Sequence, residues 1–392
     1  MDFSFSDEQQ QLRDAVRRYL SQEYAFDARN KIIHGVGTSP QAWAGLAELG
    51  LLGVPVPEEH GGFGANGVDL LVVMEELGRG LVIEPYFATA VLGAALLRFG
   101  GGAHAQALLP RVADGSLKLA AALTENQSRH ELFNIATTLK GGVLNGAKTV
   151  VLHGAEADRL IVAARSSGAQ RDTAGITLVV VDSKAAGVRI EGYRTIDGMR
   201  AADVSFTNVA AGADAVLGKA GEGYAVLERA AEVAIAALAA EAIGAMSALH
   251  EATVEYLKTR KQFGVPIGKF QVLQHRAVEM FMEIEQARSL AMLAAVKVDS
   301  ADAAERARAV HAAKVRVGRA AKFVGQAAIQ MHGGMGMTDE LNVGHYFKRL
   351  AMIEATLGDT DHHLAQFAAL GGAADATGST DVNSQKADLK AA

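Results

Sequence analysis

The order of hydrophobic patterns along the chain is the feature that most limits its fold. Apolar residues recur at helical spacing over residues 6–117 and again over 224–370, whereas residues 119–221 contain short β-rich runs separated by turn signals. An α, β, α order without alternating βαβ units argues against a doubly wound dinucleotide-binding fold. We therefore expect a mainly α protein with a central antiparallel β domain.

These changes of pattern divide the 392 residues into segments, and a chain of this length can bury more than one core. The expected segments are an N-terminal helical domain (1–118), a central β domain (119–222), a C-terminal helical domain (223–370) and a disordered tail (371–392). The tail is assigned because it is polar, rich in Ala and Gly, and unpatterned.

Local signals refine this division. The clearest strands are 160–164 and 176–181, and glycine-containing turns are expected at Gly141-Gly142, Asn145-Gly146 and Asp197-Gly198. Helical spacing in the C-terminal segment breaks at 264–268 and 332–336.

Composition excludes several classes of function. Hydrophobic residues make up 49% of the chain but aromatics only 6%, which favours tightly packed helices rich in Ala, Leu and Val. The net charge of −6 comes from interspersed charges without a basic stripe, so we expect no nucleic-acid partner. The absence of cysteine excludes disulfides, thiolate metal sites and a cysteine nucleophile.

The sequence predicts neither a membrane-spanning helix nor secretory export. The opening residues, MDFSFSDEQQQ, lack a basic segment followed by an apolar core. The Ala-rich run 230–248 is interrupted by Glu232 and Glu241, which is typical of a buried helix. We expect a soluble, cytoplasmic protein.

Several motifs, in order along residues 1–370, resemble those of the acyl-CoA dehydrogenase family. The motifs are MDF with EQ and LR in the first 13 residues, LAELGLLGVPVPEEHGGFG (46–64), MEELGRG (74–80), LNGAKTVVLHGAEAD (144–158), YLKTRKQFGVPIGKFQ (256–271) and AIQMHGGMGMT (328–338). The resemblance implies an N-terminal helical domain, a β-barrel domain and a C-terminal four-helix bundle that builds an oligomer.

The resemblance also implies a reaction. FAD takes a hydride from the β-carbon of an acyl-CoA thioester while a carboxylate removes the α-proton, and an electron-transfer flavoprotein accepts the electrons. The matching residues that would contact a neighbouring subunit's FAD are Arg260, Gln262, Phe263, Gln330, Gly333 and Gly334. A guanidinium pairs well with phosphate, and glycines permit close backbone approach. Read alone, Arg260 is a solvated helix-end cation and the glycines are a helix stop.

The half-site for the chain's own flavin ring departs from the family pattern. Where the family has a Thr-Glu-Pro-x-x-Gly-Ser-Asp stretch, this sequence has Leu123-Thr124-Glu125-Asn126-Gln127-Ser128-Arg129-His130, so only Thr124 and Glu125 are kept. The Trp and Thr that usually follow the hairpin Lys are replaced, because Lys148 is followed by Thr149, Val150, Val151 and Leu152. The indole platform for the ring is therefore missing.

The catalytic base also departs from the pattern. Glu354 is the best single candidate, although counting from Gly333 places the family position at Thr356, or at Gly358 with a small insertion. An alternative family position, at the start of the first bundle helix, holds Ala234 and Ile235. Asp359 and Asp361 are weaker candidates. Adjacent histidines on a helix point in different directions, so we expect no metal site at His362-His363.

These losses resemble the smaller subunit of heteromeric acyl-CoA dehydrogenases of the pimeloyl-CoA or steroid side-chain type. Two unlike chains would then share each FAD in a tetramer. Three alternatives stay open: a self-sufficient homotetramer using Glu354, a non-catalytic assembly subunit, and a flavin oxidase on the same fold. The acyl chain is not indicated by the sequence.

Overall fold

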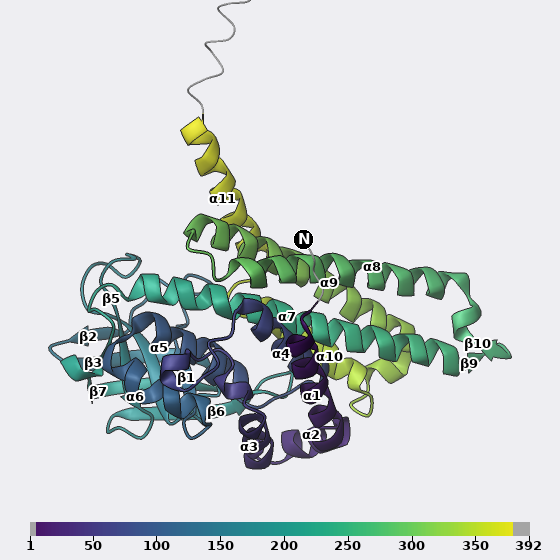
Figure 1. Ribbon diagram of the computed structural model, residues 1–392, viewed down its shortest axis with the longest axis horizontal. Coiled ribbons are helices and arrows are strands. Elements are labelled where there is room, and N and C mark those ends of the chain that lie inside the picture. The colour runs from purple at the N-terminus through teal and green to yellow at the C-terminus, as the bar shows by residue number, and fades with distance from the viewer. Residues whose placement is uncertain (1–4, 379–392) are drawn as a thin grey trace, which may run out of the picture.

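The computed structural model describes residues 5–378. The protein is elongated, with the β-sheet at one end and the short hairpin β9–β10 at the opposite end of a long helical bundle (Figure 1). Strands begin at residue 119 and the first bundle helix begins at Gly223, which matches the expected change of pattern along the chain.

The N-terminal part is helical throughout, and the described chain contains no strand before residue 119. Ser6 starts the first helix with a capping box, in which it accepts from the Gln9 amide and Gln9 reaches back to the Ser6 amide. The helices are α1 (Asp7–Glu23), α2 (Phe26–His34), α3 (Pro40–Glu48), α4 (Gly67–Arg79), the π-helix η3 (Phe87–Gly93), α5 (Ala94–Gly100) and α6 (Gly102–Ala113).

The β part forms one sheet with the strand order β6-β7-β3-β2-β4-β5-β8, and β1 pairs with β4. Its strands are β1 (Leu119–Ala122), β2 (Thr138–Lys140), β3 (Val143–Leu152), β4 (Arg159–Arg165), β5 (Ile176–Asp182), β6 (Val188–Arg194), β7 (Arg200–Ala210) and β8 (Val216–Leu217). The expected strands 160–164 and 176–181 lie within β4 and β5.

Two features of the sheet differ from expectation. The sheet is mainly antiparallel, but β1 and β2 both pair with β4 in parallel, because each reaches β4 through a long connection rather than a tight turn. Asn145-Gly146 is no turn: Gly146 lies inside β3 at an irregularity in its pairing with β7. The Gly141-Gly142 turn joins β2 to β3, and Gly198 lies between β6 and β7.

The C-terminal part is a bundle around the 37-residue helix α7. Its elements are α7 (Gly223–Thr259), the hairpin β9 (Lys261–Gln262) and β10 (Val265–Pro266), α8 (Gln271–Lys297), α9 (Ala303–His332), α10 (Asn342–Ala355) and α11 (Thr360–Gly378). By length and composition alone α7 could cross a membrane, but 89% of its most apolar window is buried within the protein. Residues 371–378, expected in a disordered tail, continue α11, and residues 379–392 lie outside the described part.

Helix α7 also packs closely on α4. A Cβ added to Gly78 of α4 or to Gly244 of α7 would overlap the backbone of the opposite helix. The two backbones can therefore approach each other only because both positions are glycine.

A buried guanidinium joins the bundle to the β-sheet. Arg349 of α10 donates to both carboxylate oxygens of Glu241 on α7 (2.5 and 2.8 Å) and to Asp197 Oδ2 in the β6–β7 turn (2.9 Å). Burial alone would lower the pKa of Arg349, but the two carboxylates outweigh it and raise that pKa. Arg29 of α2 donates to the Asp197 carbonyl oxygen (3.1 Å), which extends the network to the N-terminal helices.

A second buried ion pair fixes the segment that follows β1. Lys148 Nζ of β3 donates to Glu125 Oε1 (2.7 Å) and to the Leu123 carbonyl oxygen (3.0 Å). The amides of Ala136 and Thr137 also donate to the Glu125 carboxylate. Burial would raise the pKa of Glu125, but Lys148 and these donors lower it to about 2.

Replacing Arg349 by Met should lower the free energy of unfolding by about 3–5 kcal/mol, because Glu241 and Asp197 remain buried without a cation. Urea unfolding of the full chain, followed by circular dichroism, measures this. The control is Arg189→Met, which removes an exposed pair with Glu191 and should change stability by less than about 1 kcal/mol. Equal midpoints for the two variants would contradict the role of Arg349.

The depressed pKa of Glu125 predicts acid sensitivity. Stabilisation by the ionised carboxylate is fully present above its ordinary pKa of 4.5 and is lost as the pH falls towards about 2. Between these values the wild type should lose stability more steeply than Glu125→Gln/Lys148→Met, which lacks the pair. Urea midpoints over a pH series measure both slopes, and parallel slopes would show that the pair contributes nothing.

Candidate active site

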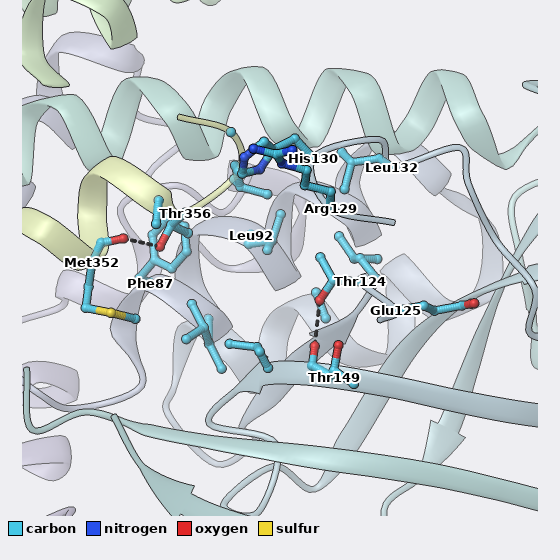
Figure 2. A pocket seen from close by; sticks show the side chains of 18 of the residues that line it. Phe87, Leu92, Thr124, Glu125, Arg129, His130, Leu132, Thr149, Met352 and Thr356 are labelled. Carbon is cyan, nitrogen blue, oxygen red and sulfur yellow. Dashed lines mark hydrogen bonds between the residues drawn. The ribbon is translucent and has the colours of Figure 1, made fainter. Parts of the chain in front are cut away.

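A cavity of about 390 Å³ lies where η3, the segment after β1, strand β3 and the end of α10 meet (Figure 2). Its size is within the range of small-molecule sites. The lining is mostly apolar and includes Phe87, Leu92, Leu123, Leu132, Val150, Leu152, Met352 and Leu357. The π-helical turn supplies Phe87, Ala88 and Leu92, and π-helical geometry is frequent at functional sites.

Thr124 lies on the wall of this cavity. Its hydroxyl donates to the Thr149 carbonyl oxygen (2.6 Å), and the Thr149 amide donates to the Thr124 carbonyl oxygen (2.9 Å). These bonds fix the segment after β1 to β3 (Figure 2). The Thr124 oxygen can still accept a hydrogen bond from a ligand.

Arg129 and His130 lie together at one side of the cavity (Figure 2). They occupy the positions where the family stretch has Gly and Ser. Arg129 has a φ of 48°, a left-handed conformation that glycine adopts at little cost and other residues rarely adopt. His130 Nε2 lies 3.1 Å from Asp359 Oδ2, in the loop between α10 and α11.

The structure does not bring Glu354 into the cavity. Glu354 is not among the described lining residues, and its Oε1 accepts the Thr360 amide at the start of α11 (2.8 Å). Its neighbours Thr356 and Gly358, the positions reached by counting from Gly333, do line the cavity, but neither ionises near neutral pH. The geometry therefore gives Glu354 a helix-capping role, because its carboxylate accepts the amide of the first residue of α11.

The other predicted cofactor residues lie at the far end of the bundle. Tyr256 near the end of α7 stacks on His332 at the end of α9 (centroids 4.3 Å apart), which brings the two signature segments together. All six residues are exposed: Arg260, Gln262, Phe263, Gln330, Gly333 and Gly334. Phe263 is 91% exposed at a φ of 54°, which is strained for an aromatic residue and typical of a functional contact.

These two groups of residues lie far apart in one chain. Arg349 of α10 pairs with Glu241 of α7, and the two helices run antiparallel. The C-terminal end of α10, which lines the cavity, therefore lies on the opposite side of this pair from Arg260. From Glu241 to Arg260 the chain advances about 28 Å at the α-helical rise. The β9–β10 hairpin and strand β1 lie at opposite ends of the protein (Figure 1). Arg260 directly precedes β9, whereas Thr124 follows β1.

Sequence reasoning missed the pairing of His130 with Asp359. The two residues are 229 positions apart, so no pattern within one segment relates them. The available signal was the replacement of the family's Gly-Ser by Arg129-His130, which introduces a titratable ring at the cavity.

Three family models match consecutive parts of the chain. They describe the N-terminal domain (residues 6–116), the middle domain (120–209) and the C-terminal domain (221–370) of acyl-CoA dehydrogenases. Together they cover most of the 392 residues.

Individual relatives agree with these matches. Acyl-CoA dehydrogenase FadE12 of Mycobacterium tuberculosis is 31% identical over 360 residues, covering 87% of this chain and 90% of that protein. A 3-(aryl)acrylate reductase of Clostridium sporogenes is 28% identical over 326 residues, with 81% and 86% covered. A structure of a variant of the Tcur3481-Tcur3483 steroid ACAD has a TM-score of 0.85 and 29% identity, with 94% of this chain and 99% of that chain covered. This chain is a member of the acyl-CoA dehydrogenase family.

Proposed function

We propose that this chain is one subunit of an acyl-CoA dehydrogenase in which an unlike second chain completes each flavin site. The observation that carries the need for a second chain is the separation of its two cofactor-related groups. The cavity with Thr124 and the exposed end with Arg260 and Gln330 lie at opposite ends of one protomer, so one FAD contacting both kinds of residue needs two chains.

The residues at the exposed end fit the diphosphate half of FAD. Arg260 offers a guanidinium to phosphate oxygens, and no atom lies within 4 Å of a Cβ placed on Gly333 or Gly334, so a ligand can approach the backbone there. Exposed Phe263 and Gln262 adjoin Arg260 on the hairpin. FAD, when bound, supplies the hydride acceptor for the β-carbon of the thioester.

An unlike partner is favoured by what the cavity lacks. Val150 and Leu152 line it where the family has an aromatic platform, and neither Thr356 nor Gly358 can act as a carboxylate base. One structural relative also carries the double designation Tcur3481-Tcur3483. In this arrangement the partner supplies the platform and the carboxylate, while this chain supplies Arg260 and Gln330 to the partner's flavin.

The substrate class and acceptor follow from the family. The reaction is α,β-desaturation of an acyl-CoA thioester, and an electron-transfer flavoprotein takes the electrons from the reduced flavin. The apolar cavity wall is compatible with an acyl chain.

Arg260→Ala should weaken FAD binding by about tenfold or more, because a charge-assisted hydrogen bond to phosphate contributes about 1.5–3 kcal/mol. The measurement is the ratio of FAD to protein in the assembly purified through a tag on this chain, followed by FAD titration. Lys258→Ala removes a nearby exposed cation that pairs with Glu255, and it should leave the ratio unchanged. Full retention of FAD by Arg260→Ala would favour a non-catalytic assembly subunit.

Expression of the chain without a partner tests the unlike-subunit arrangement. We expect substoichiometric FAD and no acyl-CoA oxidation, because the ring half of each site is incomplete. Coexpression with a second chain carrying the missing Trp and Glu should restore both. A yellow, active homo-oligomer from the single gene would refute the need for an unlike chain, and rapid reoxidation by oxygen would indicate an oxidase.

A further inference from the structure

A histidine–carboxylate pair lies at the wall of this chain's cavity, where the positions reached by counting from Gly333 hold Thr356 and Gly358 rather than a carboxylate. His130 lines the cavity, and its Nε2 lies 3.1 Å from Asp359 Oδ2. Asp359 is itself fixed, because its Oδ1 accepts the amide of His362 (2.8 Å). The side chains of His130 and Asp359 are 21% and 31% exposed, so the pair touches both the cavity and solvent.

Asp359 determines which nitrogen of His130 carries the proton. The His362 amide, followed by His130 itself, lowers the pKa of Asp359, so this carboxylate is ionised and can only accept hydrogen bonds. Nε2 must therefore be the protonated nitrogen of the neutral ring. Nδ1 then has a free lone pair, and no hydrogen bond to it is found in the described part of the chain.

The other ionisable residues of the described lining cannot accept a proton at neutral pH. Lys148 and two backbone amides occupy the Glu125 carboxylate and hold its pKa at about 2. Arg129 carries a permanent positive charge. His130 is the remaining titratable side chain of that lining.

We propose that His130, positioned by Asp359, accepts the α-proton of an acyl-CoA thioester bound in this chain's own cavity. The Cα–H bond breaks, an N–H bond forms at Nδ1, and the released electron pair is delocalised into the thioester carbonyl as an enolate. Return of a proton from the imidazolium to Cα restores the thioester. The inference rests on the substrate class of the proposed function, but this step needs no oxidant and no flavin in the cavity.

The charges around His130 are compatible with this step. Asp359 stabilises the imidazolium that forms, and Arg129 adds a positive charge to the lining of the same cavity. His362 lies 5.5 Å from His130, ring to ring, and burial followed by the charge of His130 lowers the pKa of His362. Glu131 adjoins His130 in the chain and pairs with Arg171.

Exchange of α-protons for deuterium tests the proposal directly. The full chain is incubated in D2O with straight-chain, branched and aryl acyl-CoA thioesters, and deuterium at Cα is measured by mass spectrometry. We expect exchange above the uncatalysed rate for at least one thioester, lowered about 100-fold or more by His130→Gln, because positioned bases contribute about 10²–10⁴-fold. Absence of exchange for every thioester would overturn the proposal.

Matched variants separate chemistry from folding. Added imidazole should restore exchange to His130→Ala, which a purely structural role for the ring would not allow. Asp359→Asn should lower exchange, because the amide can stabilise the wrong tautomer. His362→Gln and Glu354→Gln should exchange as the wild type does, and loss in Glu354→Gln with retention in His130→Gln would return the role to Glu354. None of these results depends on the FAD content that tests flavin sharing.

Discussion

The buried guanidinium of Arg349 is the interaction on which the arrangement of the protein depends. It contacts carboxylates from α7 and from the β6–β7 turn, and Arg29 adds the N-terminal helices through the carbonyl group of Asp197. A buried cation with two carboxylates tolerates little displacement, because any shift leaves a charge without a partner. The orientation of the sheet relative to the bundle, and hence the cavity between them, follows from this cluster.

The second constraint is the length of α7. Its first half packs beside the sheet and η3, and its last turn leads to the exposed hairpin with Phe263. A protomer built on such a helix presents an apolar cavity at one end and a cationic end at the other. In the proposed assembly, cofactor contacts that are separated within one chain become adjacent between two chains.

The sequence was sufficient to predict the order of structural elements. Helical and alternating patterns change close to residues 119 and 223, and glycine pairs mark the turns at Gly141 and Gly198. The parallel pairing of β1 with β4 was not predictable, because it depends on contacts across 40 residues rather than on a local turn. The helical continuation of residues 371–378 was also missed, since Ala-rich segments without apolar periodicity give little signal.

The candidate site shows the same difference between local sequence patterns, which are predictable, and long-range contacts, which are not. The two motifs that contain Arg260 and Gln330 lie close together, because Tyr256 stacks on His332. Local similarity favours Glu354, but the end of α10 turns its carboxylate to the start of α11. The contact between His130 and Asp359 required the fold, because the two belong to different domains. Helix α7 contacts η3, which lines the cavity, and its last turn leads to the β9–β10 hairpin. A bend in this helix would therefore displace the cavity wall and the hairpin together. In the proposed assembly, such a bend would couple substrate binding in one subunit to cofactor affinity in its neighbour, with the backbone curvature of a single helix as the shared variable.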